Sequence, residues 1–161
     1  MAAHRSAFIA HERTGSVLAF DFGEKRIGVA VGDLALRIAH PLTTLCAEDS
    51  RGRFAAIGAL IEEWRPVALV VGVQFQEDER EHELARLACR FARRLEGRYR
   101  LPVRLVDERL TSYMAEAALR EQGVRRKEMR ATIDAAAAQH ILQAYFESLN
   151  SAERSGKPAG A

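Results

Sequence analysis

The sequence contains little cysteine, few lysines and no long hydrophobic run. Its two cysteines, Cys46 and Cys89, are isolated and lack metal-ligand spacing, so we expect reduced thiols rather than a disulfide or a zinc site. No apolar stretch approaches the roughly 20 residues of a membrane-spanning helix. Residues 1–15 carry charges and histidines instead of the continuous apolar core of a secretory signal. These absences predict a cytoplasmic protein that does not associate with membranes.

Lysine is scarce because arginine supplies 21 of the 24 basic residues. The guanidinium group suits bidentate contact with phosphate, but codon usage in a GC-rich genome gives the same bias, and we favour codon usage for the total. The net charge is only +2, so charge alone gives no reason to expect nucleic-acid binding. A chain of 161 residues with 48% hydrophobic and 29% charged residues is typical of one globular domain.

Hydrophobic periodicity divides the chain into nine expected elements between two polar ends. Residues 1–15 are expected to form a flexible arm, and residues 150–161 a disordered tail. Apolar runs of strand length and segments of helical spacing follow the order β-β-β-α-β-α-β-α-α. Strands are expected at residues 17–22, 26–32, 36–45 (broken at Pro41), 67–73 and 102–106, and helices at 51–65, 78–98, 112–121 and 131–149.

This order predicts a mixed five-stranded sheet. The first two strands form a hairpin, and the βαβ crossovers that follow place helices on both faces of the sheet. The expected architecture is therefore a three-layer α/β domain over residues 16–149. In such folds, functional sites form where the loops at the strand ends converge. Acidic residues near strand ends are the first candidates for a site.

Asp21 is the strongest single candidate. It lies between Phe20 and Phe22 in a strand whose apolar character predicts burial on both faces. An unpaired carboxylate costs several kcal/mol to bury. A metal ion would remove that cost, and so would an ion pair with Lys25 or Arg26 across the hairpin. We favour the functional interpretation.

Two further acidic segments lie near strand or helix ends. Asp107 and Glu108 close the fifth strand before a helix start, where the helix dipole is an equally good explanation for an acid. Asp134 begins the last helix, and the four alanines after it would let that helix approach the sheet and bring Asp134 towards the strand ends. Acids brought together from separate elements are how proteins hold Mg²⁺ or Mn²⁺ against phosphate.

A basic segment directly precedes Asp134. It is expected to form a loop over residues 124–130, and runs of charge are usually solvated surface. Beside a metal site, however, a cationic loop would position a polyanionic substrate. The basic residues concerned are Arg125, Arg126, Lys127 and Arg130.

Five short motifs follow one another along the chain: FDFGEKRIGVAVGD at residues 20–33, VVG at 70–72, VDERLTS at 106–112, RK at 126–127 and IDAAA at 133–137. In this order they resemble the YqgF/RuvX family. These are small RNase H-like proteins described as Holliday junction resolvases and as pre-16S rRNA nucleases. The resemblance covers roughly residues 16–149, and the combination of the opening motif with the Asp-Glu-Arg-Leu-Thr phrase is quite specific.

The resemblance implies an RNase H-like nuclease that uses Mg²⁺ or Mn²⁺, with two ions in an in-line attack on a phosphodiester. It implies that Asp21 and Asp134 are catalytic metal ligands, and that Glu108, with Asp107 as a rival, supplies the second acid. Phosphate contacts are expected from Lys25, Arg26 and Arg109, together with the basic residues of segment 124–130.

The acidic residues and the family resemblance together suggest three functions. The leading hypothesis is a nuclease that processes the 5′ end of pre-16S rRNA in contact with ribosomal particles, acting as a monomer or weak homodimer. The second is a DNA junction resolvase, which needs a dimer because two symmetric cuts require two sites. The third is a non-catalytic rRNA-binding module. It stays open because residues 73–80 lack the Leu-Pro phrase and the glycine-containing loop usual in the family.

Overall fold

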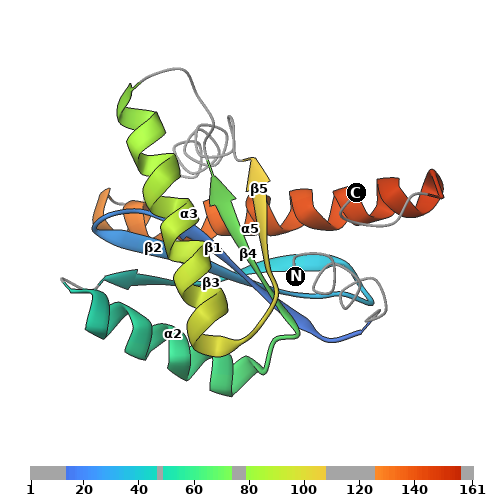
Figure 1. Ribbon diagram of the computed structural model, residues 1–161, viewed down its shortest axis with the longest axis horizontal. Coiled ribbons are helices and arrows are strands. Elements are labelled where there is room, and N and C mark those ends of the chain that lie inside the picture. The colour runs from blue at the N-terminus through green and yellow to red at the C-terminus, as the bar shows by residue number, and fades with distance from the viewer. Residues whose placement is uncertain (1–13, 47–48, 74–78, 108–125, 157–161) are drawn as a thin grey trace.

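The computed structural model describes residues 14–46, 49–73, 79–107 and 126–156. Within these residues the chain forms five strands and three helices (Figure 1). The strands are β1 (Ser16–Phe22), β2 (Arg26–Asp33), β3 (Ile38–Cys46), β4 (Ala68–Val73) and β5 (Val103–Asp107), and the helices are α2 (Ser50–Trp64), α3 (Glu79–Tyr99) and α5 (Arg126–Arg154). The helix expected at residues 112–121 lies outside the described residues.

The five strands form one mixed sheet in the order β3-β2-β1-β4-β5. β1 pairs with β2, and β2 with β3, in antiparallel orientation, which confirms the expected hairpin. β1 pairs with β4, and β4 with β5, in parallel orientation. β1 is the central strand, and its residues Val17, Leu18, Ala19 and Phe20 are fully buried. Such burial explains the nearly continuous apolar sequence of this strand.

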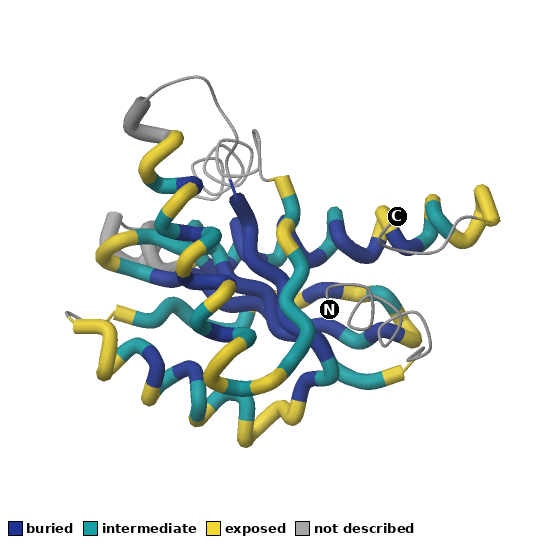
Figure 2. Tube along the Cα trace, in the orientation of Figure 1, coloured by how far each residue is buried: buried dark blue, intermediate teal, exposed yellow. Residues whose placement is uncertain are grey.

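The helices cover both faces of the sheet, as predicted. Figure 1 shows α3 in front of the sheet and α5 behind it. Val17 and Ala19 of β1 pack in one core with residues of α5 such as Phe146. Leu18 and Phe20 point the other way and pack in a second core with residues of α2 and α3. The sheet is therefore the middle layer of a three-layer α/β fold, and its three central strands β2, β1 and β4 are the most buried (Figure 2).

Strand β3 differs from the prediction, because it is not broken at Pro41. The strand covers Ile38–Cys46 and runs through the proline without interruption. Pro41 pairs with Ala30 at the point where the β2–β3 register shifts between Val29 and Ala30. Proline lacks an N–H donor and is tolerated in edge strands and at bulges. β3 is at the edge of the sheet, so the proline costs the ladder little.

Helix α5 is longer at both ends than the predicted segment 131–149. It begins at Arg126, so the predicted loop over residues 124–130 is wrong from Arg126 onward. It ends at Arg154, so residues 150–154 are helical and not part of a disordered tail. The side chain of Arg37 donates to Asn150 and to Glu153, the latter over 3.1 Å from Nη1 to Oε2. These contacts hold the last turns of α5 against the β2–β3 turn.

Two smaller expectations concern cysteines and membranes. Cys46 is exposed and Cys89 is half-buried, and both are free, as predicted. Among the described residues, no helix combines the length and the apolar character needed to cross a bilayer.

Candidate active site at the carboxyl end of strand β1

Asp21 lies one residue before the end of the central strand, on the sheet face that α5 covers. Side chains alternate along a strand, and Val17 and Ala19 belong to the core under α5, so Asp21 shares their face. Its register partners are Gly28 on β2 and Gly72 on β4. Neither neighbour has a side chain, so the Asp21 carboxylate is not covered from within the sheet and is only half-buried.

Helix α5 approaches the sheet most closely beside this row. A Cβ atom added to Gly28 would lie 1.9 Å from the backbone oxygen of Asp134. Ala135 and Ala138, in the turn that follows, are buried. The prediction that small residues let the last helix approach the strand ends is confirmed. The consequence is that Asp134 lies next to the strand residue that pairs with Asp21.

Asp134 forms an ion pair with Arg26. The Nε atom of Arg26 donates to Oδ2 of Asp134 over 2.7 Å, and the two side chains are 38% and 20% exposed. Arg26 precedes Gly28 by two residues and so points to the same face of β2. This basic partner reduces the cost of a half-buried carboxylate. The helix dipole does not account for an acid at position 134, because α5 begins eight residues earlier and the dipole acts within the first turn.

Asp107 lies on the opposite face of the sheet from Asp21. In the β4–β5 register, Gly72 pairs with Val106 and Val73 pairs with Asp107. Val106 packs against the core under α5, whereas Val73 belongs to the core under α2 and α3. Asp107 is therefore on the α3 side and is exposed. This geometry does not bring Asp107 towards Asp21.

The comparison with protein families agrees with these motifs. A family model described as "RuvX: Holliday junction resolvase" matches residues 15–148. The chain belongs to the RuvX family. The resemblance stated from the sequence motifs is thereby confirmed.

Relatives of this RuvX-family chain match most of its length. A protein of Nitrosomonas europaea, called "Putative pre-16S rRNA nuclease", is 57% identical over 134 residues, which are 83% of this chain and 90% of the relative. A protein of Dechloromonas aromatica with the same description is 58% identical over 134 residues, 83% of this chain and 92% of the relative.

A solved structure shares the fold. T. thermophilus RuvC in complex with Holliday junction substrate superposes with a TM-score of 0.52 and 19% identity, covering 85% of this chain and 96% of that chain. At this identity the match shows an RNase H-like fold and no more. It confirms the fold class predicted for the RuvX-family chain.

The described part of the chain holds only some of the predicted site residues. Within it, no three His, Cys, Asp or Glu side chains gather closely enough to hold a metal ion. Lys25 is exposed in the β1–β2 turn. Glu108, Arg109 and Arg125 lie outside the described residues, and Arg126, Lys127 and Arg130 lie in the first turns of α5, where only the backbone is described.

Sequence reasoning missed one cluster of basic residues. Arg53 of α2 and Arg90 and Arg94 of α3 line a pocket on the face opposite α5. The signal was present in the sequence as arginines four residues apart along the expected helix 78–98. The pocket could not be predicted from this spacing, because Arg53 of α2 joins the arginines of α3 only when the two helices pack together.

Proposed function

We propose that this protein is a cytoplasmic nuclease that hydrolyses phosphodiester bonds and processes the 5′ end of pre-16S rRNA in ribosome biogenesis. The observation that carries the proposal is the packing of Asp134 of α5 beside Gly28, the strand partner of Asp21. Two acids from distant parts of the chain thus share one end of the sheet. The description of the relatives supports pre-16S rRNA as the substrate.

The donor set suits a hard divalent cation. Asp21 and Asp134 offer carboxylate oxygens, the ligand type that Mg²⁺ and Mn²⁺ prefer. We assign Glu108 as the second acid, because Asp107 lies on the other face of the sheet. Two ions held by these acids would supply an activated water and stabilise charge on the leaving oxygen.

Arg26 has a defined task in this proposal. Its Nε donates to Asp134, and among the described residues no other acceptor contacts the guanidinium. The terminal nitrogens can therefore donate to a phosphate oxygen while Nε keeps Asp134 in place. Lys25, in the same turn, adds an exposed cation. Further backbone contacts to RNA are proposed for Arg109, Arg125, Arg126, Lys127 and Arg130.

The test compares three acid variants on a labelled, 5′-extended 16S precursor fragment with Mn²⁺, Mg²⁺ or EDTA. We expect Asp21→Asn and Glu108→Gln to lose metal-dependent cleavage. Asp107→Asn is the matched control, since it removes a neighbouring carboxylate from the opposite face, and we expect it to retain cleavage. Wild-type activity in the Asp21→Asn variant would contradict the proposal.

A second candidate is a DNA junction resolvase, which the description of the RuvX family favours. A four-way DNA junction tested beside the RNA distinguishes the two. Cleavage of the junction alone would establish the resolvase. Retained RNA binding without cleavage of either substrate would favour a non-catalytic binding module and direct attention to residues 73–80.

A further inference from the structure

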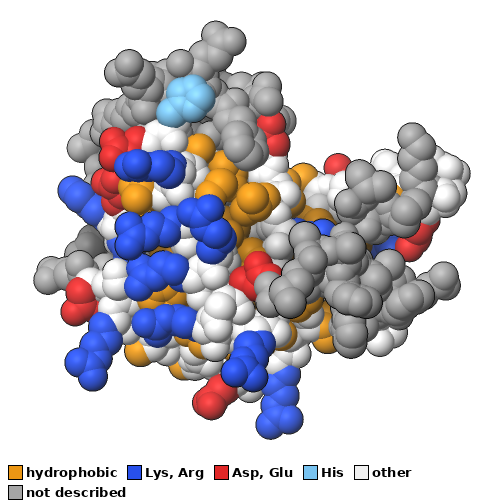
Figure 3. Space-filling view, in the orientation of Figure 1, with side chains coloured by type: hydrophobic (Ala, Val, Ile, Leu, Met, Phe, Trp, Pro, Cys, Tyr) orange, Lys and Arg blue, Asp and Glu red, His pale blue; other side chains and the backbone are white. Residues whose placement is uncertain are grey.

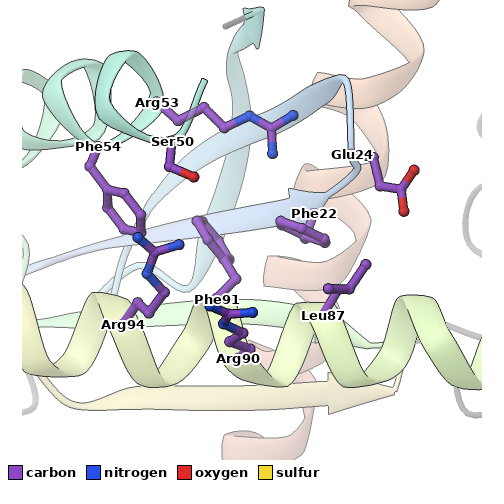
Figure 4. Close-up of a pocket in the computed structure, with 9 residues that line it drawn as sticks. All are labelled: Phe22, Glu24, Ser50, Arg53, Phe54, Leu87, Arg90, Phe91 and Arg94. Atoms are coloured by element: carbon purple, nitrogen blue, oxygen red, sulfur yellow. The ribbon is translucent and has the colours of Figure 1, made fainter. Parts of the chain in front are cut away.

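A pocket of about 290 Å³ lies between the first turn of α2, the middle of α3 and the end of β1. Figure 4 shows that its side chains come from all three elements and surround a common space. It is on the sheet face opposite Asp134, because Phe22 points away from Asp21 and towards the core under α2 and α3. The pocket is thus distinct from the candidate active site.

The charge of this pocket favours an anionic ligand. Three guanidinium groups line it, those of Arg53, Arg90 and Arg94, against the single carboxylate of Glu24. Arg90 and Arg94 form no ion pair with any described residue. Figure 3 shows Lys and Arg side chains gathered along α3 on this side of the molecule. The guanidinium fork matches the geometry of phosphate oxygens.

The inner wall of the pocket is aromatic. Phe91 contacts the rings of Phe22 and Phe54 in tilted geometry, with ring centroids 5.0 Å and 6.0 Å away, respectively. The guanidinium of Arg94 lies 4.7 Å from the centre of the Phe54 ring, which holds this cation over the aromatic wall. Phe22 is half-buried and leaves part of its ring to a ligand. Cations beside an aromatic surface are the combination that binds phosphate together with a nucleobase.

The basic character continues along α3 beyond the pocket. Arg86, Arg90, Arg94 and Arg98 are spaced four residues apart, so they follow one side of the helix at intervals of about 6 Å. The pair of Arg86 with Glu83, 3.5 Å apart and largely exposed, is too weak to neutralise this row. A row of cations at that interval can follow successive phosphates of an extended strand.

We propose that this pocket binds a nucleotide of a single-stranded RNA segment, with the phosphate on Arg90 and Arg94 and the base or ribose against Phe22. The arginine row of α3 holds the neighbouring phosphates. That the strand is RNA rests on the proposed function, but binding at this pocket needs neither the acids nor a metal.

The test measures binding of a labelled oligouridylate by fluorescence anisotropy in EDTA, in an Asp21→Asn background that prevents cleavage. We expect Arg90→Ala to weaken binding about tenfold and to reduce the steepness of the log–log salt dependence by about 0.7. The matched control is Arg93→Ala, an exposed arginine on the same helix outside the pocket. We expect it to change affinity less than about twofold.

Equal losses of affinity in Arg90→Ala and Arg93→Ala would overturn the proposal in favour of general attraction to a basic helix. Unchanged binding in the Arg90→Ala, Arg94→Ala double variant would overturn it as well.

A competition experiment distinguishes a nucleotide site from a general anion site. Uridine monophosphate should displace the oligonucleotide better than inorganic phosphate does, and Phe22→Leu should remove that advantage. Equal competition would overturn the nucleotide assignment. RNA cleavage is measured separately, with the wild-type protein. If Arg90→Ala weakens binding but the wild-type protein cleaves no RNA, the proposed nuclease alone is refuted. If the wild-type protein cleaves RNA and Arg90→Ala leaves binding unchanged, the pocket alone is refuted.

Discussion

Gly28 decides how close the last helix can come to the sheet. A methyl group there would meet the backbone oxygen of Asp134 at 1.9 Å, and a backbone atom cannot rotate away as a side chain can. The same position is the register partner of Asp21. The absence of one side chain therefore brings the two candidate acids to the same part of the sheet.

Gly28→Ala should consequently lower the free energy of unfolding by about 3 kcal/mol or more, at the upper end of overpacking costs. Urea denaturation measures this change. Gly97→Ala is the matched control: no atom lies within 4 Å of its added Cβ, and it is inside α3, so it should stabilise the protein by about 0.5–1 kcal/mol. Similar stability of the two variants would show that α5 shifts freely, and the packing argument would be wrong.

The elements could be predicted largely because their apolar sequences reflect burial. β1 and β4 are buried on both faces, and their continuous hydrophobic runs gave their positions within a residue. The break at Pro41 was wrong because a bulge is a property of the paired strands, which one strand's sequence does not contain. The start of α5 was wrong because a basic run is compatible with a loop or with an exposed helical turn.

Two residues of the candidate site could be chosen from the sequence, but their contacts could not. Asp21 and Asp134 could be chosen from their local sequence, since a carboxylate in an apolar strand and an acid before four alanines are both unusual. The ion pair between Arg26 and Asp134 could not, because it joins residues 108 positions apart. The arginine pocket also depends on the packing of two helices. Whether Glu108 completes the acid set stays a prediction.

Contacts from the β2–β3 turn stabilise the last helical turns of α5. Arg37 lies in the β2–β3 turn with a left-handed backbone, φ 56°, and its guanidinium contacts Asn150 and pairs with Glu153. Arg37→Ala should increase hydrogen exchange in residues 150–154 and lower the free energy of unfolding by about 1 kcal/mol. Exchange followed by mass spectrometry locates the effect.

The control for this prediction is Arg65→Ala. Arg65 is also left-handed, with φ 44°, and is exposed, so the substitution keeps the same backbone strain without removing a contact to α5. It should leave exchange at residues 150–154 unchanged. Faster exchange there in both variants would mean that Arg37 does not hold the helix end.

At the scale of the whole molecule, charge is distributed unevenly although the net value is only +2. Arginines line α3 and the pocket on one side of the sheet, while Asp21 and Asp134 lie on the other. The small net charge therefore says nothing against nucleic-acid binding. A nucleic acid meets a local surface and not the average over the molecule.

The large exposed hydrophobic side chains of the described residues predict a monomer. They are few and lie at three separate places, the start of β3, the end of α2 and β5, so those of the described residues form no extended apolar interface. These residues are Leu36, Ile38, Trp64 and Leu105. Sedimentation velocity at micromolar concentration should give the mass of one chain. A four-way junction should then be nicked rather than resolved into ligatable pairs, because paired cuts need two sites. A stable dimer with ligatable products would contradict this prediction.

The contact between Arg26 and Asp134 also sets an order in time. A ribosome makes β1 and β2 early, but α5 is the last of the described elements to be synthesised. The acid end of the sheet cannot be assembled until that helix has been made and has docked against Gly28. If this end cleaves RNA, the growing chain cannot do so before α5 has been synthesised, although it is attached to the ribosome and surrounded by ribosomal RNA throughout that time.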